Sequence, residues 1–232
     1  MRKDIDGVAF DLDGTLYPNY RFYIRLLPFL LKECRLIGAL GKARRILRED
    51  SALRNSNGGH NPEGGSFYER QSCLMGKILK RNPRAIQEKT ERLIYRGWEP
   101  LFKGLKIFPL VKETLHSFRN AGLKLGLLSD FPPERKLEYL GLSGLWDAVL
   151  CSETFGFLKP DPVPFLELSS QMGVKPERLL YVGNSISYDI KGARNAGLQA
   201  ALICSSCWKR HYRGEAAFVF SNYRQLYNYM LG

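Results

Sequence analysis

The chain has 232 residues, of which 44% are hydrophobic and 25% charged, and its formal net charge is +12. This composition is typical of a globular protein that buries its own core, and it excludes collagen-like, coiled-coil and wholly disordered chains. The net charge is −2 over residues 1–20, +11 over 21–106 and +3 over 107–232. A basic middle block can attract anions, and it is equally what a solvated helical surface carries.

The beginning of the chain does not have the pattern of a membrane span or a secretory leader. The apolar stretch from Phe22 to Lys32 contains Arg25 and Pro28, and it is far shorter than the roughly 20 residues that cross a bilayer. The first apolar run carries Asp11 and Asp13, so a leader is not expected. The cysteines are odd in number and scattered, which favours reduced thiols: Cys34, Cys73, Cys151, Cys204 and Cys207. We therefore expect a cytoplasmic protein.

Short apolar runs alternate with helical patterns through most of the chain. The runs predict strands at 8–12, 123–128, 148–151, 179–182 and 200–203. Helical spacing predicts helices at 109–121, 133–140, 162–172, 186–196 and 222–230. The alternation predicts an α/β fold, with a parallel sheet and right-handed crossovers.

Residues 17–106 interrupt this alternation. Their apolar residues fit helical faces, as in Leu74, Ile78 and Leu79, so we expect a mainly helical insert. Residues 55–66 are rich in glycine, asparagine and serine and predict a loop. We predict a core of residues 1–16 and 107–232 and an inserted domain of residues 17–106.

Two carboxylates follow the first strand. Asp11 and Asp13 are two residues apart, so on an extended chain they project to the same side, at the edge of the sheet where α/β proteins bind ligands. Two carboxylates this close do not both stay ionised without a cation or a shared proton. The pair therefore indicates either a hard cation such as Mg²⁺ or one carboxylate acting as nucleophile and the other as general acid. Taken alone, the pair is as well explained by a turn, because aspartate and glycine are frequent there.

The later strands end in further reactive side chains. Ser129 and Asp130 end the second strand, Lys159 lies among prolines after the third, and Asn184 follows the fourth with Asp189 five residues on. Each alone could be a helix cap or a surface charge. Together, a carboxylate nucleophile, a hydroxyl donor, a cation and oxygen ligands meet the demands of phosphoryl transfer.

The ordered set resembles the haloacid dehalogenase superfamily of hydrolases. The matching motifs are DLDGTL at 11–16, LLSD at 127–130, GFLKPDP at 156–162 and VGNSISYDIKGARNAG at 182–197, in that family's order. The resemblance implies a Rossmann-like core with helices on both faces and a helical cap inserted between the first two motifs. The predicted insert, residues 17–106, stands at that position.

The resemblance also implies roles for single residues. Asp11 would be the nucleophile that forms an aspartyl-phosphate, and Asp13 the general acid and base. Thr15, Ser129 and Asp130 would bind the phosphate of the substrate.

The remaining family positions would supply charge and a metal. Lys159 would balance charge at the reaction centre, and Mg²⁺ would be held by Asp11, the backbone carbonyl of Asp13, Asn184 and Asp189. Asn184 stands where the family's commonest residue is aspartate. Its neutral amide can still bind Mg²⁺ but removes one negative charge from the site.

The function expected from this set is that of a Mg²⁺-dependent phosphatase for a small, anionic phosphorylated metabolite. Alternatives within the superfamily are a phosphomutase or a dehalogenase. A non-catalytic regulatory protein, weakened by Asn184, is the alternative of another class.

Two other patterns carry less weight. Cys204 and Cys207, with His211 nearby, lack the second ligand pair that a zinc site needs. The basic insert lacks an ordered series of aromatic and basic residues, so we do not expect nucleic-acid binding.

Overall fold

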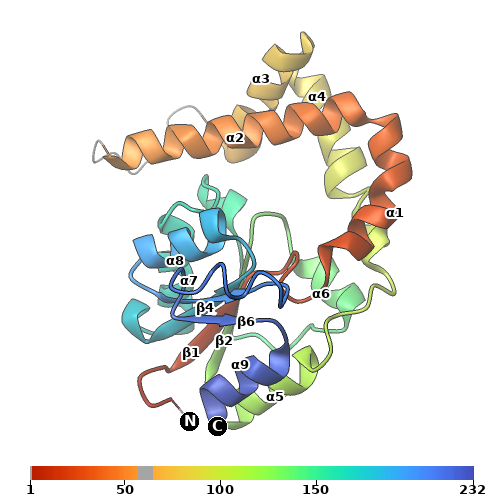
Figure 1. The fold of residues 1–232 in the computed structure, drawn as a ribbon. Coiled ribbons are helices and arrows are strands. Elements are labelled where there is room, and N and C mark those ends of the chain that lie inside the picture. Colours follow the sequence, from red (N-terminus) through yellow and green to blue (C-terminus); the bar gives the residue numbers. More distant parts are fainter. Residues whose placement is uncertain (1, 57–64) are drawn as a thin grey trace.

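Over residues 2–56 and 65–232, which the computed structural model describes, six strands form one parallel sheet in the order β3-β2-β1-β4-β5-β6 (Figure 1). The strands are β1 (Gly7–Phe10), β2 (Lys124–Ser129), β3 (Ala148–Cys151), β4 (Leu179–Gly183), β5 (Gln199–Ile203) and β6 (Phe218–Phe220). The central strand, β1, lies between β2 and β4, with Val8 paired to Leu125 and Leu180. The carboxyl ends of these three strands therefore meet at one edge.

Both faces of the sheet are covered, which explains why its strands are continuous apolar runs. Val8 and Phe10 belong to the core cluster on one face, and Ala9 to the cluster on the other. The first face packs α5 (Val111–Asn120), α6 (Glu134–Leu140) and α9 (Tyr223–Leu231). The second packs α7 (Val163–Met172) and α8 (Lys191–Asn195).

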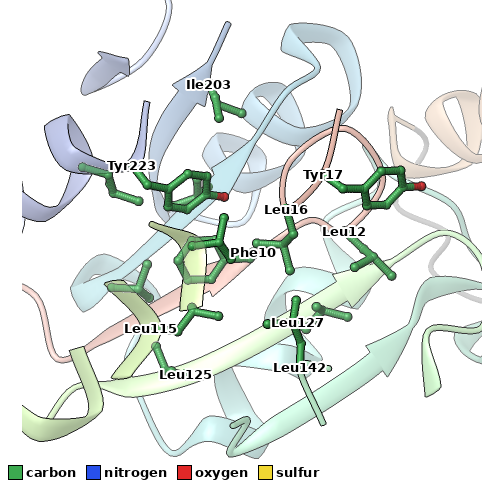
Figure 2. Close-up of a cluster of buried hydrophobic side chains, with 14 of the residues drawn as sticks. Phe10, Leu12, Leu16, Tyr17, Leu115, Leu125, Leu127, Leu142, Ile203 and Tyr223 are labelled. Carbon is green, nitrogen blue, oxygen red and sulfur yellow. The ribbon is translucent and has the colours of Figure 1, made fainter. Parts of the chain in front are cut away.

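The cluster on the first face joins elements that are far apart in the sequence. Figure 2 shows Phe10 of β1 among side chains that include Leu115 of α5, Leu125 of β2 and Tyr223 of α9. The Tyr223 hydroxyl donates a hydrogen bond of 2.8 Å to the carbonyl of Thr15, so α9 also fixes the loop after β1.

Between β1 and α5 the chain is helical. The elements are α1 (Asn19–Lys32), α2 (Cys34–Ser56), α3 (Phe67–Leu79), α4 (Pro83–Thr90), a π-helical turn η1 (Glu91–Tyr95) and a 3₁₀ turn η2 (Glu99–Phe102). Ser66 and Glu69 form a capping box at the start of α3, and the Asn82 side chain caps α4. In Figure 1, α2 runs across the top of the view above the sheet.

Single helical turns complete the core. They are the 3₁₀ turns η3 (Ser152–Phe155) and η4 (Pro176–Arg178) and the π-helical turn η5 (Ile186–Ile190). In the part of the chain that the structure describes, no helix is long and apolar enough to cross a membrane.

The α/β fold with its parallel sheet is confirmed, and all five predicted strands are present. The prediction missed β6, whose three residues are too few to make a recognisable apolar run. The predicted loop at 55–66 began too early, because α2 continues to Ser56. Residues 57–64 of that loop lie outside the described residues.

Candidate active site

The carboxyl edge of the sheet brings three of the sequence motifs together. Asp11 follows β1, Ser129 ends β2 and Asn184 follows β4, and these three strands are neighbours. Lys159, which belongs to the remaining motif at 156–162, enters from the segment after η3.

A buried chain of charges forms the floor of the site. The Lys159 ammonium lies 2.7 Å from Asp11 Oδ1 and 2.7 Å from Asp189 Oδ1, and it also donates to the Tyr181 hydroxyl at 3.2 Å. Thr15 Oγ1 donates to the other Asp11 oxygen at 2.8 Å. The Asp11 carboxylate is thus fixed between a hydroxyl and a cation.

Burial and the neighbouring opposite charges shift the pKa values of Asp11 and Lys159 in opposite directions. Burial raises the pKa of Asp11 to about 7, and Asp189 and Asp13 act in the same direction, while Lys159 opposes them. Burial alone would lower the pKa of Lys159, but Asp11 and Asp189 outweigh it and hold that pKa well above its usual value. Lys159 therefore stays protonated and remains the compensating cation.

Asp13 faces the site with two partners of its own. The Tyr17 hydroxyl donates to Asp13 Oδ1 at 2.5 Å, and the Lys136 ammonium lies 2.7 Å from Oδ2. Burial raises the pKa of Tyr17 far above its ordinary value, so its hydroxyl keeps the proton that it donates. Lys136 also lies over the rings of Phe102 and Phe131, at 5.1 and 5.4 Å from their centres.

The three predicted phosphate-binding residues occupy different surroundings. Thr15 and Ser129 are fully buried, and Ser129 Oγ accepts a hydrogen bond from the backbone N–H of Phe131 at 3.2 Å. Asp130 lines the cavity described below and accepts from the backbone N–H of Lys159 at 3.0 Å. Burial acts to raise the pKa of Asp130, but nearby cations, Lys159 first among them, lower it below its usual value. The direct contact of all three with phosphate stays a prediction.

The loop after β4 packs tightly against the loop after β1. The φ of Gly14 is +89°, and a Cβ atom there would lie 2.3 Å from Asn184 Nδ2, so both the backbone conformation and the close approach favour glycine. Asn184 thus lies beside the peptide that follows Asp13. The second carboxylate oxygen of Asp189 accepts from the backbone N–H groups of Asn184 and Ser185, at 3.1 and 3.0 Å.

The donors at this edge fit a hard divalent cation. The Asp11 carboxylate, the Asp13 carbonyl and the Asn184 amide provide oxygen atoms, which Mg²⁺ prefers. Both oxygens of Asp189 and both of Asp11 already accept hydrogen bonds, so the places of these two carboxylates as ligands stay a prediction. Within residues 2–56 and 65–232 the structure has no group of three acidic, histidine or cysteine side chains arranged for a metal, and the oxygen set proposed here includes an amide and a backbone carbonyl instead.

Comparison with known proteins places this geometry in a family. The family model of haloacid dehalogenase-like hydrolases matches residues 5–197. The chain belongs to the haloacid dehalogenase-like hydrolase family. It is therefore a hydrolase, and the family predicted from the four motifs is confirmed.

Two phosphatases are similar to most of the chain. A glyceraldehyde 3-phosphate phosphatase of Methanothermobacter thermautotrophicus is 30% identical over 207 residues, which cover 87% of this chain and 86% of the relative. The phosphoglycolate phosphatase of Escherichia coli strain K12 is 30% identical over 216 residues, 84% of this chain and 79% of the relative.

Solved structures of the family share the fold. An L-2-haloacid dehalogenase superposes with a TM-score of 0.65 at 21% identity, over 98% of this chain and 99% of the other. A HAD phosphatase from Thermococcus onnurineus has a TM-score of 0.61 at 23% identity, over 98% and 99% of the two chains.

In this HAD-like hydrolase, α2 is hydrogen-bonded to the reactive edge of the core. Its residues Arg44, Arg48 and Ser51 are four and three positions apart and so lie on one helix face. Arg48 donates to the Lys159 carbonyl at 2.9 Å and to Asp130 Oδ2 at 2.8 Å. The Ser51 hydroxyl donates to the Asp161 carboxylate. We call these contacts, with the Arg44 contacts described next, the α2 clasp.

Arg44 makes the most buried contact of the α2 clasp. Its side chain is 6% exposed and is ion-paired with Glu153, which is completely buried. It also donates to the Asp130 carbonyl at 3.0 Å. Tyr95 donates to the same Glu153 carboxylate at 2.9 Å.

We predict that Arg44→Ala lowers the free energy of unfolding by about 3–5 kcal/mol, because it leaves the Glu153 carboxylate buried without a cation. Denaturant titration measures the change. The control is Arg45→Ala, on the same helix, whose side chain is 68% exposed and which should change stability by less than about 0.5 kcal/mol. Equal effects of the two substitutions would contradict the buried pair.

A cavity of about 520 Å³ opens above the reactive edge. Its lining includes Asp11, Asp13, Lys159 and Asn184, and side chains of the helical insert form much of the rest. The cavity therefore joins the reactive groups to a wall supplied by residues outside the core.

Several residues of the site could not be predicted from the sequence. Lys136, Tyr17 and Tyr181 contact the reactive side chains, and Arg44 and Arg48 contact the segments that carry them. For Arg44 and Arg48, the only signal in the sequence was their spacing on one helical face. That spacing does not predict which surface the helical face packs against. Lys136 looked like any charged residue of an amphipathic helix.

Proposed function

We propose that the protein is a phosphatase that hydrolyses a phosphate monoester through a covalent intermediate on Asp11. The observation that carries this proposal is the Asp11 carboxylate, held between Thr15 and Lys159 at the floor of the cavity, with Asp13 beside it. The similarity to two kinds of phosphatase supports the same reaction.

The residues divide the reaction into two displacements. A carboxylate oxygen of Asp11 attacks phosphorus, the ester oxygen leaves with the bonding electrons, and Asp13 gives it a proton. The structure pairs the Asp13 carboxylate with Lys136, so Asp13 must take up that proton before this step. Asp13, now ionised, takes a proton from a water molecule that attacks the same phosphorus. Inorganic phosphate leaves, and the Asp11 carboxylate is restored. Lys159 compensates the charge that builds up around Asp11.

We propose that Mg²⁺ is the cofactor, held by the Asp11 carboxylate, the Asp13 carbonyl and the Asn184 amide, with Asp189 completing or supporting the set. When bound, it would offset the negative charge of the phosphate group. Asp189 has a clear supporting part, because it fixes Lys159 and the loop that carries Asn184.

We propose that residues 17–106 act as a cap over a core of residues 1–16 and 107–232. The insert contributes cavity lining and carries the α2 clasp. It can therefore shield the reaction from bulk water while it selects the substrate.

We place the protein in the cytoplasm. All five cysteines are free thiols in the structure, as a reducing compartment would leave them.

The test of this function is the release of inorganic phosphate from a general aryl phosphate in the presence of Mg²⁺. We expect turnover that stops when a chelator removes the metal. Absence of turnover on any phosphate ester, at millimolar Mg²⁺, would favour a non-catalytic protein.

The Asp13 side chain separates a phosphatase from a dehalogenase. A dehalogenase releases a halide and has no leaving oxygen to protonate, whereas phosphate ester cleavage needs the acid. We predict that Asp13→Asn lowers kcat for an alkyl phosphate by about 10²- to 10⁴-fold, measured by phosphate release.

The matched control for Asp13→Asn is Asp50→Asn, which changes an exposed carboxylate of α2 and should leave kcat unchanged. Release of halide from a 2-haloacid by the wild-type protein, undiminished in Asp13→Asn, would identify a dehalogenase instead.

A further inference from the structure

Much of the cavity lining outside the reactive edge is apolar. Side chains from α1, α2, the segment between η1 and η2, and the loop after β2 form this apolar part, among them Phe22, Leu26, Leu30, Leu40, Trp98 and Phe131. An apolar wall that faces a ligand favours an apolar ligand group, because contact with it removes both surfaces from water.

The aromatic part of this wall is fixed by its own packing. Phe22 stacks on Phe102 with ring centres 4.7 Å apart. The Trp98 ring is edge-on to Phe22, with centres 6.0 Å apart, and tilted against Phe131, with centres 6.2 Å apart. The wall is therefore formed in advance, and a ligand need not order it on binding.

The basic side chains of the cavity are already ion-paired. Among the described residues, four basic side chains line the cavity, and each contacts a carboxylate of the core: Arg44 with Glu153, Arg48 with Asp130, Lys136 with Asp13, and Lys159 with Asp11 and Asp189. A second anionic group on a substrate would have to compete with these carboxylates for the cations. The Glu99 side chain, also in the lining, is ion-paired with Arg96 and adds no cation to the wall.

We propose that the substrate is a phosphate monoester of an uncharged, apolar alcohol, with an aromatic or branched aliphatic group seated against this wall. The inference rests on the proposed phosphatase activity and adds the chemical class of the organic part. A volume of about 520 Å³ lies within the roughly 300–1,000 Å³ typical of sites for such ligands. The class differs from the small polar esters named for the relatives.

The test compares three primary phosphate esters: 3-phenylpropyl phosphate, glycerol 1-phosphate and phosphoglycolate. Because all three release a primary alkoxide, their ratio of kcat/KM reports mainly on the organic group. We expect kcat/KM for 3-phenylpropyl phosphate to be about 10- to 100-fold higher than for the other two, since burial of the phenyl group adds binding energy. A preference for phosphoglycolate would overturn the inference while leaving the phosphatase proposal intact. No phosphate from any ester would refute the phosphatase proposal itself.

Two glycines of α2 provide a steric test with a matched control. Gly41 lines the cavity and Gly38 does not, and a Cβ at either position meets no atom within 4 Å. Gly41→Leu should lower kcat/KM for 3-phenylpropyl phosphate by about tenfold or more and change glycerol 1-phosphate by less than about twofold. Gly38→Leu should change neither. Equal loss for both esters in Gly41→Leu would contradict an organic group seated on this wall.

Two adjacent leucines of α1 test the charge argument. Leu30 lines the cavity, whereas Leu31 is 76% exposed and lies outside it. Leu30→Lys adds a cation without a carboxylate partner, so it should raise the ratio of kcat/KM for phosphoglycolate to that for 3-phenylpropyl phosphate by about tenfold. Leu31→Lys should leave the ratio unchanged. An unchanged ratio in a folded Leu30→Lys protein, judged by circular dichroism, would contradict the inference.

Discussion

Asp11→Asn is expected to lower kcat/KM for phosphate release by at least about 10⁴-fold, the scale seen when a catalytic nucleophile is removed. The amide keeps the shape of the side chain but is a far weaker nucleophile than the carboxylate. Lys159 still has Asp189 as a partner at 2.7 Å, so the site should remain folded. Steady-state phosphate release measures the loss, and circular dichroism checks the fold.

The control for this prediction is again Asp50→Asn, which removes an exposed carboxylate of α2. It should retain the wild-type kcat/KM. If Asp11→Asn retained activity within about tenfold of wild type, Asp11 would not be the nucleophile. Removal of the attacking atom should lower the activity far more than about tenfold.

Lys159→Met is expected to affect both catalysis and stability. It removes the cation that touches Asp11 and Asp189, leaving two carboxylates that are 8% and 2% exposed. We expect kcat to fall by about 10³-fold and the free energy of unfolding by about 3–5 kcal/mol. Phosphate release and denaturant titration measure the two effects on the same preparation.

Two further substitutions make the Lys159 result specific. Lys175→Met changes an exposed lysine and should alter neither quantity. Lys159→Arg keeps the positive charge and should recover part of the stability, but not kcat, because the larger guanidinium cannot occupy the same position between two buried carboxylates. A Lys159→Met protein with wild-type kcat would show that the charge of Lys159 takes no part in the reaction.

The core of the fold could be predicted because its signals are local. The strand at Leu179–Gly183 is an apolar run, and its end carries Asn184 directly. Parallel strands bring their carboxyl ends to one edge, so Asp11 and Asn184 could be placed near each other from their order alone. Lys159 also follows this rule, since it comes after β3.

The contacts made by the insert could not be predicted in this way. Arg44 and Arg48 contributed only to a count of positive charge in the sequence, whereas the structure pairs them with Glu153 and Asp130. Those pairs depend on how α2 crosses the core, and no local pattern encodes that angle. The same holds for Lys136, which reaches Asp13 across 123 positions of the chain.

The α2 clasp links the insert to the chemistry. Arg48 donates to the carbonyl of Lys159 and to the carboxylate of Asp130, so the position of α2 and the position of Lys159 depend on each other. A ligand that contacts the insert wall can therefore influence the reactive edge through contacts that are already formed.

The most direct measurement is acid quenching of the protein during turnover of a phosphate monoester, followed by mass spectrometry of the peptides. The proposed reaction predicts one added phosphoryl group on the peptide that contains Asp11, and none on that peptide from Asp11→Asn. Turnover without any phosphorylated peptide, or a phosphoryl group found on another residue, would contradict the covalent step on Asp11.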